Sequence, residues 1–256
     1  MNAALPLQGL GVVITRPRAA ADALAASLER EGARAFVFPA LAIEPVPPSA
    51  ALDAALDALA AGGLAIFVSA NAVEMGLVAA RARGRWPARV AAVGEATAQA
   101  LRNSGFAEVI SPRERHDSEA LLACPELQAV SGAGIVIFRG AGGRELLRET
   151  LEKRGARVTY AECYRRIRPA ADPRPLLDAW ARGEVQAVSV LSAETLENFV
   201  ALLGEAGTPR LAEATLVVPH EAVGKHPLCR RFARVLVAPP GAHGLPRALA
   251  SLRMTT

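Results

Sequence analysis

The chain has 256 residues, of which 52% are hydrophobic and 4% aromatic, and its formal net charge is +4. A nucleic-acid-binding protein is expected to cluster its basic residues and to interleave them with aromatic ones, whereas the arginines of this chain are scattered. The composition therefore argues against a nucleic-acid partner. The arginine excess fits either the composition of the genome or a modest attraction for anions.

The cysteines and the first residues bear on location. Cys124, Cys163 and Cys229 form no CxxC pair, as is typical of proteins in a reducing compartment. Residues 1–6 lack the charged and apolar regions of a signal peptide, and no apolar run reaches the length of a membrane span. We therefore expect a soluble cytoplasmic protein with no membrane partner.

The first elements of the chain recur later in it. Residues 11–34 align with residues 134–157 at a constant offset of 123, and ten of the 24 positions are identical, among them Arg16 with Arg139. The same offset carries the strand-like run 65–68 onto 188–191. A period of this length indicates a duplicated domain rather than a solenoid.

Each copy predicts the same succession of elements. A Val/Ile run predicts a buried strand, an amphipathic stretch predicts a helix, and a Gly-Ala-Arg turn leads into a second strand. Strands that alternate with helices are typical of parallel sheets with helices on both faces. The predicted fold class is α/β.

The proline-rich stretches suggest where the chain passes between domains. They follow the second strand in both copies, at 43–48 and 165–175, whereas 117–127 predicts an ordinary helix. Breaks at these two places indicate that the chain passes between two domains twice. We predict two flavodoxin-like parallel-sheet domains, one made of residues 1–42 plus 170–256 and one of residues 47–164, joined by linker strands at 43–46 and 165–169.

The glycine-rich turn at 139–143 comes directly between a predicted strand and a helix. No lysine and hydroxyl follow it as a P-loop requires, and the third glycine of a dinucleotide fingerprint is missing. The glycines then serve either a tight strand-to-helix turn or an anion site made of backbone N–H groups at a helix start. Both interpretations stay open.

Three other loops have the same geometry. Ser69-Ala70-Asn71, Ser192-Ala193-Glu194 and Gly94-Glu95-Ala96-Thr97 each end a strand and open a helix. A serine at such a place is also a good N-cap, and capping alone would explain it. In a doubly wound sheet, ligands bind outside the carboxyl ends of the strands, so we expect these turns to face one cleft that takes a multiply charged anion.

Common catalytic and metal-binding patterns are missing from the sequence. The histidines form no HExxH motif or ligand-spaced pair, and no GxSxG elbow is present. We therefore expect no metal site. The chain is either a binding protein or an enzyme whose chemistry depends on positioning more than on strong acids and bases.

The order and spacing of several motifs resemble the uroporphyrinogen-III synthase family. The motifs are VVITRP (12–17), FPALAIEPV (38–46), FVSANAV (67–73), AAVGEATAQAL (91–101), SEALL (118–122), FRGAGGRELLRETLEKRGARV (138–158) and ECYRR (162–166). The resemblance implies two α/β domains joined by a two-stranded linker. It also implies a lyase of haem biosynthesis that cyclises hydroxymethylbilane to uroporphyrinogen III without cofactor or metal, with loss of water and inversion of the last pyrrole ring.

The resemblance implies roles for individual residues. Tyr164 matches the family's tyrosine near the linker and is expected to help the hydroxyl leave; an amphipathic hinge tyrosine is the alternative. The family's cleft hydroxyls fall on Ser69, Thr97 and Ser192. The expected substrate-binding residues are Arg16, Ser69, Ala70, Asn71, Gly94, Thr97, Arg139, Gly140, Gly142, Ser192 and His220.

The C-terminal third departs from the family pattern. Where the family commonly has a glycine followed by threonines, this chain has His220, Glu221, Ala222 and Val223. His220 either replaces the lost hydroxyl or only caps a helix. The departure keeps open a non-catalytic cleft protein that binds a multiply anionic small molecule. A two-domain nucleotide-sugar transferase would need a diphosphate-binding loop, which is not found in this sequence. We expect a monomer.

Overall fold

The computed structural model describes residues 5–59, 63–241 and 243–253. The chain divides into two compact units, which we call unit 1 (residues 1–42 and 167–256) and unit 2 (residues 43–166). The two passages between units fall in β3, Ala42–Pro45, and at the end of β7, Arg157–Ile167. The finer domain and linker boundaries given above stay a prediction, and their outermost residues, 1–4 and 254–256, lie outside the described residues.

Unit 1 contains a five-stranded sheet in the order β10-β9-β8-β1-β2, and every neighbouring pair is parallel. Its strands are β1 Gly11–Ile14, β2 Arg34–Val37, β8 Ala187–Ser189, β9 Thr215–Val218 and β10 Arg234–Val237. Its helices are α1 Arg18–Arg30, α7 Arg174–Ala181, α8 Ala193–Gly207, α9 Glu221–Gly224 and α10 Gly244–Arg253, with 3-10 helices η3 Thr208–Glu213 and η4 Pro227–Arg231.

Unit 2 contains a second five-stranded sheet in the order β3-β7-β6-β4-β5, in which β7, β6, β4 and β5 pair in parallel. Its remaining strands are β4 Leu64–Phe67, β5 Arg89–Ala92 and β6 Gly134–Gly140. Its helices are α2 Ala50–Ala58, α3 Ala70–Ala82, α4 Glu95–Asn103, α5 Ser118–Leu122 and α6 Leu146–Lys153, with the 3-10 helix η2 Pro125–Leu127. The predicted α/β class with two parallel sheets is confirmed.

The two sheets repeat one order of strands. β1 lies between β2 and β8, and β6, its counterpart in the repeated segment, lies between β7 and β4. The registers repeat as well, because Gly11 pairs with Arg34 and Gly134 pairs with Arg157. The aligned segments of the sequence therefore occupy equivalent strands of the two units.

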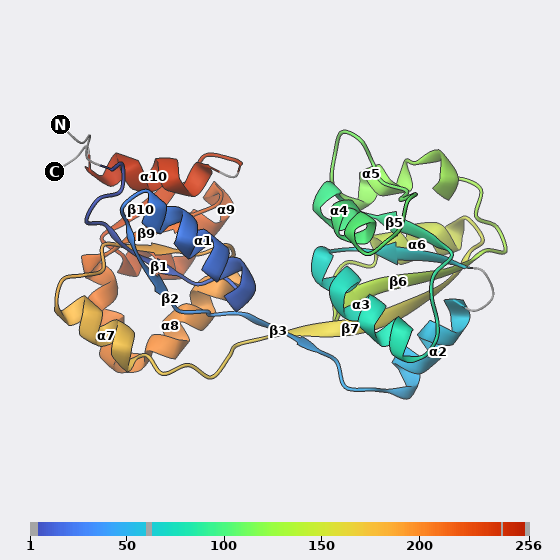
Figure 1. The fold of residues 1–256 in the computed structure, drawn as a ribbon, viewed down its shortest axis with the longest axis horizontal. Coiled ribbons are helices and arrows are strands. Elements are labelled where there is room, and N and C mark those ends of the chain that lie inside the picture. The colour runs from blue at the N-terminus through green and yellow to red at the C-terminus, as the bar shows by residue number, and fades with distance from the viewer. Residues whose placement is uncertain (1–4, 60–62, 242, 254–256) are drawn as a thin grey trace. The chain divides into compact units, whose positions relative to one another are not determined.

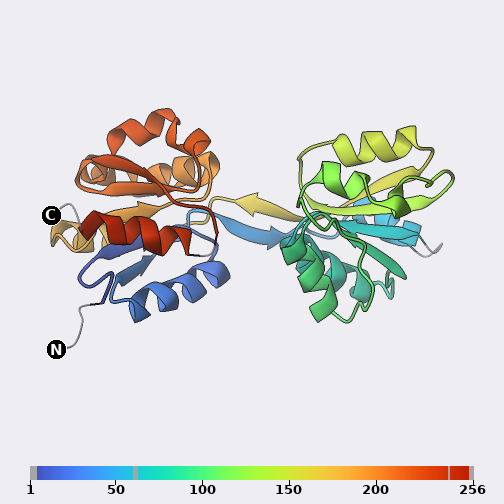
Figure 2. The ribbon, with the colours of Figure 1, turned by 90° about the horizontal axis from the view of Figure 1, so that it is seen from above.

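Helices cover both faces of each sheet (Figures 1 and 2). Because side chains alternate along a strand, Val13 of β1 packs with Trp180 of α7 and Phe199 of α8, whereas Ile14 packs on the other face with Leu28 of α1. Parallel strands buried on both faces need nearly continuous apolar runs, which explains the unbroken Val/Ile character of β1.

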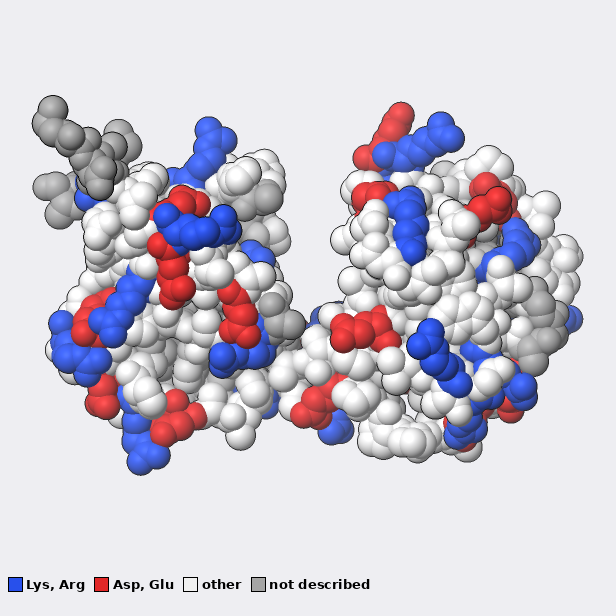
Figure 3. Space-filling model, viewed as in Figure 1, with Lys and Arg blue, Asp and Glu red and all other residues white. Residues whose placement is uncertain are grey.

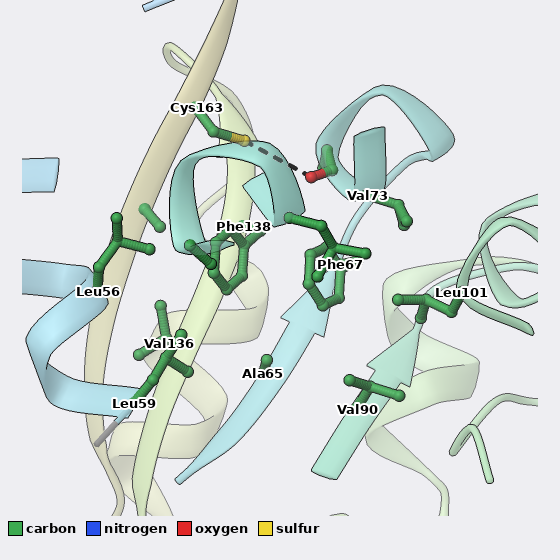
Figure 4. Packing of buried hydrophobic residues seen from close by; sticks show 14 of the residues in the cluster. Leu56, Leu59, Ala65, Phe67, Val73, Val90, Leu101, Val136, Phe138 and Cys163 are labelled. Carbon is green, nitrogen blue, oxygen red and sulfur yellow. Dashed lines mark hydrogen bonds between the residues drawn. The ribbon is translucent and has the colours of Figure 1, made fainter. Parts of the chain in front are cut away.

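The core of unit 2 depends on close contacts between β4, β6 and α3 (Figure 4). Phe67 and Phe138, on neighbouring strands, stack with ring centroids 4.5 Å apart. Gly76 of α3 faces the Phe138 ring so closely that a Cβ there would clash. The Cys163 thiol of β7 donates a weak hydrogen bond to the Ala72 carbonyl, at 3.7 Å. These contacts fix the start of α3 against β6 and β7.

The single helix predicted over 117–127 is wrong in its length. Asp117 caps α5 by accepting a hydrogen bond from the Ala120 N–H at 2.8 Å, but α5 ends at Leu122. Cys124 is extended, as the residue before a proline usually is, and Pro125 then opens η2. The proline therefore divides the segment into two short turns.

Candidate functional site

The strand orders define a switch point in each sheet, where the connections leave in opposite directions. In unit 1 it lies between β1 and β8, and in unit 2 between β6 and β4. Open α/β sheets bind ligands outside the carboxyl ends of the strands at such points. The ends of these four strands, with the loops and helix starts after them, hold eight of the twelve predicted site residues: Arg16, Ser69, Ala70, Asn71, Arg139, Gly140, Gly142 and Ser192. A ninth, Tyr164, lies on β7, the strand beside β6.

A cavity of about 190 Å³ lies at the carboxyl edge of the unit 2 sheet. Among the residues that line it are Arg139, Gly140, Gly142, Tyr160 and Tyr164. Four of these are predicted site residues, and Tyr160 is an addition. The structure thus brings the tyrosine, the arginine and the glycine-rich turn together.

The Tyr164 hydroxyl is held at the start of α3. It lies 3.1 Å from the Ser69 Oγ, which also accepts a hydrogen bond from the Ala72 N–H at 3.1 Å. The Tyr164 ring packs against Gly140, where a Cβ would come within 2.7 Å of the ring. Tyr164 is buried, and its hydroxyl and ring are both fixed, so it is a rigid group on the cavity wall.

The glycine-rich turn wraps around Arg139, which is buried. The Arg139 Nε donates to the Gly142 carbonyl at 3.0 Å, and Nη1 donates to Glu145 Oε1 at 3.0 Å. Gly143 has a φ of +124°, and a Cβ there would come within 2.7 Å of the guanidinium. The glycines are therefore needed for a tight turn over a buried cation.

The first backbone N–H groups of this turn already donate hydrogen bonds within the protein and are not free to bind an anion. The Ala141 N–H donates to the Tyr164 carbonyl at 2.8 Å, and the Gly142 N–H donates to Glu162 Oε1 at 3.1 Å. Of the two interpretations of the turn, these contacts favour the tight turn. The Nε and Nη1 of Arg139 are bonded within its own unit, and its role as a substrate-binding residue stays a prediction.

Tyr160 and Glu145 complete the surroundings of Arg139. The Arg139 guanidinium lies over the Tyr160 ring at 4.4 Å, and the Tyr160 hydroxyl donates to Glu145 Oε2 at 2.8 Å. This hydrogen bond, with that from Arg139, lowers the pKa of Glu145. Burial and the hydrogen bond to Glu145 raise the pKa of Tyr160 to about 12. The group is a closed network of a cation, a phenol and a carboxylate.

The remaining unit 2 candidates lie at helix starts. Ala70 and Asn71 form the first turn of α3, with Ala70 exposed. Gly94 is the N-cap of α4, where a Cβ would come within 3.1 Å of the His116 Cβ, and Thr97 is buried in the first turn. None of these four lines the 190 Å³ cavity.

A second cavity, of about 210 Å³, lies at the carboxyl edge of the unit 1 sheet. Arg16, Ser189, Pro219, Pro240 and Leu245 are among the residues that line it. Sequence reasoning singled out Arg16 but missed Ser189, because a single serine inside an apolar strand gives no motif.

The two C-terminal candidates do not line this cavity. Ser192 caps α8, accepting from the Thr195 N–H at 3.2 Å and lying 2.9 Å from the Thr195 Oγ1. His220 holds the N-cap position of α9, but its side chain makes no capping hydrogen bond and is exposed. The prediction of His220 as a substrate-binding residue stays untested by these contacts.

The described residues contain neither a metal-binding cluster nor a membrane-spanning helix. Within 5–59, 63–241 and 243–253, no three His, Cys, Asp or Glu side chains are grouped as a metal site requires. No helix in the described part of the chain is long and apolar enough to span a membrane.

The fold and the cavities define an α/β protein of two units, each with a cavity lined in part by an arginine at the carboxyl edge of its sheet. The sequence profile of the family described as uroporphyrinogen-III synthase HemD matches residues 22–239. The chain therefore belongs to the uroporphyrinogen-III synthase family, a family of lyases, and the resemblance seen in the motifs is confirmed.

Curated relatives agree with this assignment. The chain is 34% identical over 197 residues to the uroporphyrinogen-III synthase of Escherichia coli K12, covering 76% of this chain and 80% of that protein. It is 37% identical over 197 residues to that of Salmonella typhimurium LT2, covering 75% of this chain and 80% of that protein.

Solved structures agree on the fold. The uroporphyrinogen-III synthetase of Helicobacter pylori 26695 superposes with a TM-score of 0.57 at 11% identity, over 96% of this chain and 98% of that one. A mutant uroporphyrinogen III synthase from the extremely thermophilic bacterium Thermus thermophilus gives a TM-score of 0.56 at 22% identity, again over 96% and 98%.

Proposed function

We propose that the chain is an enzyme that cyclises hydroxymethylbilane to uroporphyrinogen III, with loss of water and inversion of the last pyrrole ring. Membership of the family supports this activity. The observation that carries the choice of site is Tyr164, which lines a cavity at the carboxyl edge of the unit 2 sheet and whose hydroxyl is held by Ser69.

In this proposal Tyr164 assists departure of the substrate hydroxyl. Its O–H donates a hydrogen bond or a proton to that hydroxyl, the carbon–oxygen bond breaks, and water leaves. A pyrrole carbon then attacks the resulting cation, and a spiro intermediate inverts the last ring. The closing ring loses one proton, which returns to Tyr164 where that residue gave one up, so the net change is loss of one water. General acid catalysis of this kind contributes about 10²–10⁴-fold to a rate.

The second task is to steer the ring closure. Uncatalysed closure gives the isomer without inversion, so the enzyme must favour one of two closing paths. A hundredfold preference needs only about 2.7 kcal/mol of differential stabilisation. Rigid groups that hold the substrate carboxylates supply such a difference without a strong acid or base.

We propose carboxylate-binding roles for the helix starts as well. Ala70 and Asn71 at α3, Gly94 and Thr97 at α4, and Ser192 at α8 stand where the N-terminal end of a helix attracts anions. Each helix terminus contributes about 0.3–1 kcal/mol, so several are needed for a substrate with many carboxylates. His220, exposed at the start of α9, belongs to the same proposal.

We propose further that the enzyme acts as a cytoplasmic monomer, without cofactor, metal or nucleic acid. On the face drawn in Figure 3, basic and acidic side chains are interspersed rather than gathered into one basic patch. Exposed pairs such as Arg102 with Glu95 at 2.8 Å contribute to this mixture. A surface of mixed charge gives little of the uniform positive field on which nucleic-acid binding depends.

The test is the isomer ratio of the product. Purified protein supplied with hydroxymethylbilane is expected to raise the fraction of type III uroporphyrinogen above that of the uncatalysed reaction. Product that stays type I in the presence of folded protein contradicts the proposal. If the same protein is still stabilised thermally by the substrate, it is a non-catalytic binding protein.

A further inference from the structure

Two arginines at equivalent positions of the duplicated segment, Arg16 and Arg139, differ in their hydrogen-bond and charge partners. Arg16, two residues after β1, and Arg139, near the end of β6, hold equivalent positions of the duplicated segment, yet among the described residues only Arg139 has partners within its unit. The Nε of Arg16 is buried and has no hydrogen-bond partner among the described residues. A buried polar group without a hydrogen-bond partner destabilises the folded protein, so its presence requires an explanation.

The partners of Arg139 have been replaced or diverted in the first copy. The position of Glu145 is taken by Asp22, whose carboxylate is bound by Arg18 at 3.0 Å. The position of Tyr160 is taken by Val37, which offers no ring face. Arg16 therefore lacks both groups that neutralise and cover its counterpart.

The path of the backbone after the two arginines also differs. In the second copy, Gly142 and Gly143 have φ values of +74° and +124°, which hold the turn over Arg139 and delay α6 until Leu146. The first copy has no glycine there, and α1 begins directly at Arg18. No carbonyl of a folded-back turn is therefore supplied to the Arg16 guanidinium.

Arg16 instead borders the 210 Å³ cavity of unit 1. Ser189, at the end of β8, also lines this cavity; it is only 5% exposed, and no hydrogen bond of its Oγ is formed within the described residues. Burial lowers the pKa of Arg16 by desolvation, which reflects how poorly its charge is compensated. Proline and apolar side chains form much of the remaining wall.

The chemistry of these groups selects a carboxylate. A guanidinium presents a planar fork of N–H donors that matches a carboxylate, and the Ser189 hydroxyl adds a donor. We infer that the unit 1 cavity is a carboxylate subsite in which Arg16 is the main ligand and Ser189 a second one. This inference rests on the proposed function, and the ligand is then an acetate or propionate side chain of the linear tetrapyrrole.

The test compares Arg16→Gln with wild-type enzyme in steady-state assays on hydroxymethylbilane. Loss of a charge-assisted hydrogen bond is expected to raise KM about tenfold, with a smaller change in kcat. The midpoint of urea unfolding is expected to stay the same or rise, because a partly buried cation whose Nε has no hydrogen-bond partner among the described residues is removed. Arg16→Lys keeps the positive charge but lacks the planar N–H donors of the guanidinium. Its KM is expected to lie between those of wild type and Arg16→Gln.

Arg18→Gln is the matched control. It removes the same charge two residues away, from an exposed side chain paired only with Asp22, and is expected to leave KM within about twofold. Uroporphyrin III, an octacarboxylate that does not react, is titrated in parallel, and its Kd is expected to rise about tenfold in Arg16→Gln only.

The outcomes separate the two proposals. Wild-type protein that makes no type III isomer contradicts the proposed function, and the uroporphyrin titration then decides on the cavity alone. An active wild type whose KM and uroporphyrin Kd are unchanged in Arg16→Gln overturns the carboxylate subsite. Equal losses in Arg16→Gln and Arg18→Gln also overturn it, because they indicate a general effect of charge.

Discussion

The hydroxyl groups of Ser69 and Tyr164 lie 3.1 Å apart although 95 residues separate them along the chain. Ser69 in turn accepts the Ala72 N–H, so the phenol is tied to the first turn of α3. Tyr164 therefore has one fixed direction in which to meet a substrate group.

Tyr164→Phe is expected to lower kcat about a hundredfold while KM changes little, because the hydroxyl acts on the leaving group in the transition state. The ring that packs on Gly140 is kept, so the free energy of unfolding should fall by no more than about 1 kcal/mol. Turnover measured by product formation, together with urea unfolding, checks both expectations. Wild-type turnover in this variant removes Tyr164 from the mechanism.

Ser69→Ala is expected to lose a helix cap and the tyrosine contact together. The cap is worth about 1 kcal/mol of folding free energy, and the lost contact should lower kcat as well. Ser49→Ala is the control, because Ser49 caps α2 by accepting the Leu52 N–H at 3.2 Å and does not touch the tyrosine. Similar destabilisation with a fall in kcat only for Ser69→Ala confirms positioning; equal kcat values argue against it.

Gly140→Ala is expected to displace the Tyr164 ring, because the new Cβ would lie 2.7 Å from it. The variant should fold with reduced stability and lowered kcat. Gly134→Ala, in the same strand, meets no atom within 4 Å and should leave both quantities near the wild-type values. A crystal structure or the Tyr164 ring signals in NMR spectra would report the displacement directly. Normal activity in Gly140→Ala would mean that the ring position is not critical.

Arg139→Gln is expected to lower the free energy of unfolding by about 2 kcal/mol, because a buried cation loses its hydrogen bonds to Gly142 and Glu145. Arg102→Gln, which breaks an exposed pair with Glu95, should cost about 0.5 kcal/mol or less. Urea unfolding of the two variants gives the comparison. Equal costs would show that Arg139 does not hold the turn.

The stability contributed by Glu145 should depend on pH. Its pKa is lowered in the folded chain, mainly by the hydrogen bond from Tyr160 and then by that from Arg139. The ionised form is thus favoured by folding, so the contribution is complete above the ordinary glutamate pKa and is lost as pH falls through the lowered value. Thermal unfolding of the wild type and of Glu145→Gln from about pH 6 to about pH 3 should show Tm values that converge. A constant difference would contradict the coupling.

Much of the fold follows from local signals. The repeated Val/Ile runs at 11–14 and 134–137 predict buried strands, and the structure places them as β1 and β6 at equivalent positions of two parallel sheets. Capping serines are also local, because a serine and the N–H it accepts are three residues apart. Ser69 and Ser192 are therefore visible from sequence as helix starts.

The contacts that define the cavities are not local, and sequence patterns do not encode them. The aligned positions suggest that Arg16 and Arg139 are alike, yet their difference depends on Glu145, Tyr160 and the path of the glycine-rich turn. Ser189 looks like any polar residue in a strand until the sheet brings it to the cavity of Arg16. The surroundings of these residues are determined by burial and by contacts between segments that are far apart in the sequence.

The order of the strands along the chain also has a consequence during protein synthesis. β1 pairs with β8, and the Thr15 hydroxyl donates to the Ser189 carbonyl across 174 residues, so the N-terminal strands emerge from the ribosome long before their partners. Every strand of the unit 2 sheet has been made by residue 167, while β8, β9 and β10 are still to come. Unit 2 is then expected to fold first. Ribosome-stalled chains long enough for residues 43–166 to have left the exit tunnel, while β9 and β10 have not, should resist protease in unit 2 but be cleaved in 11–37.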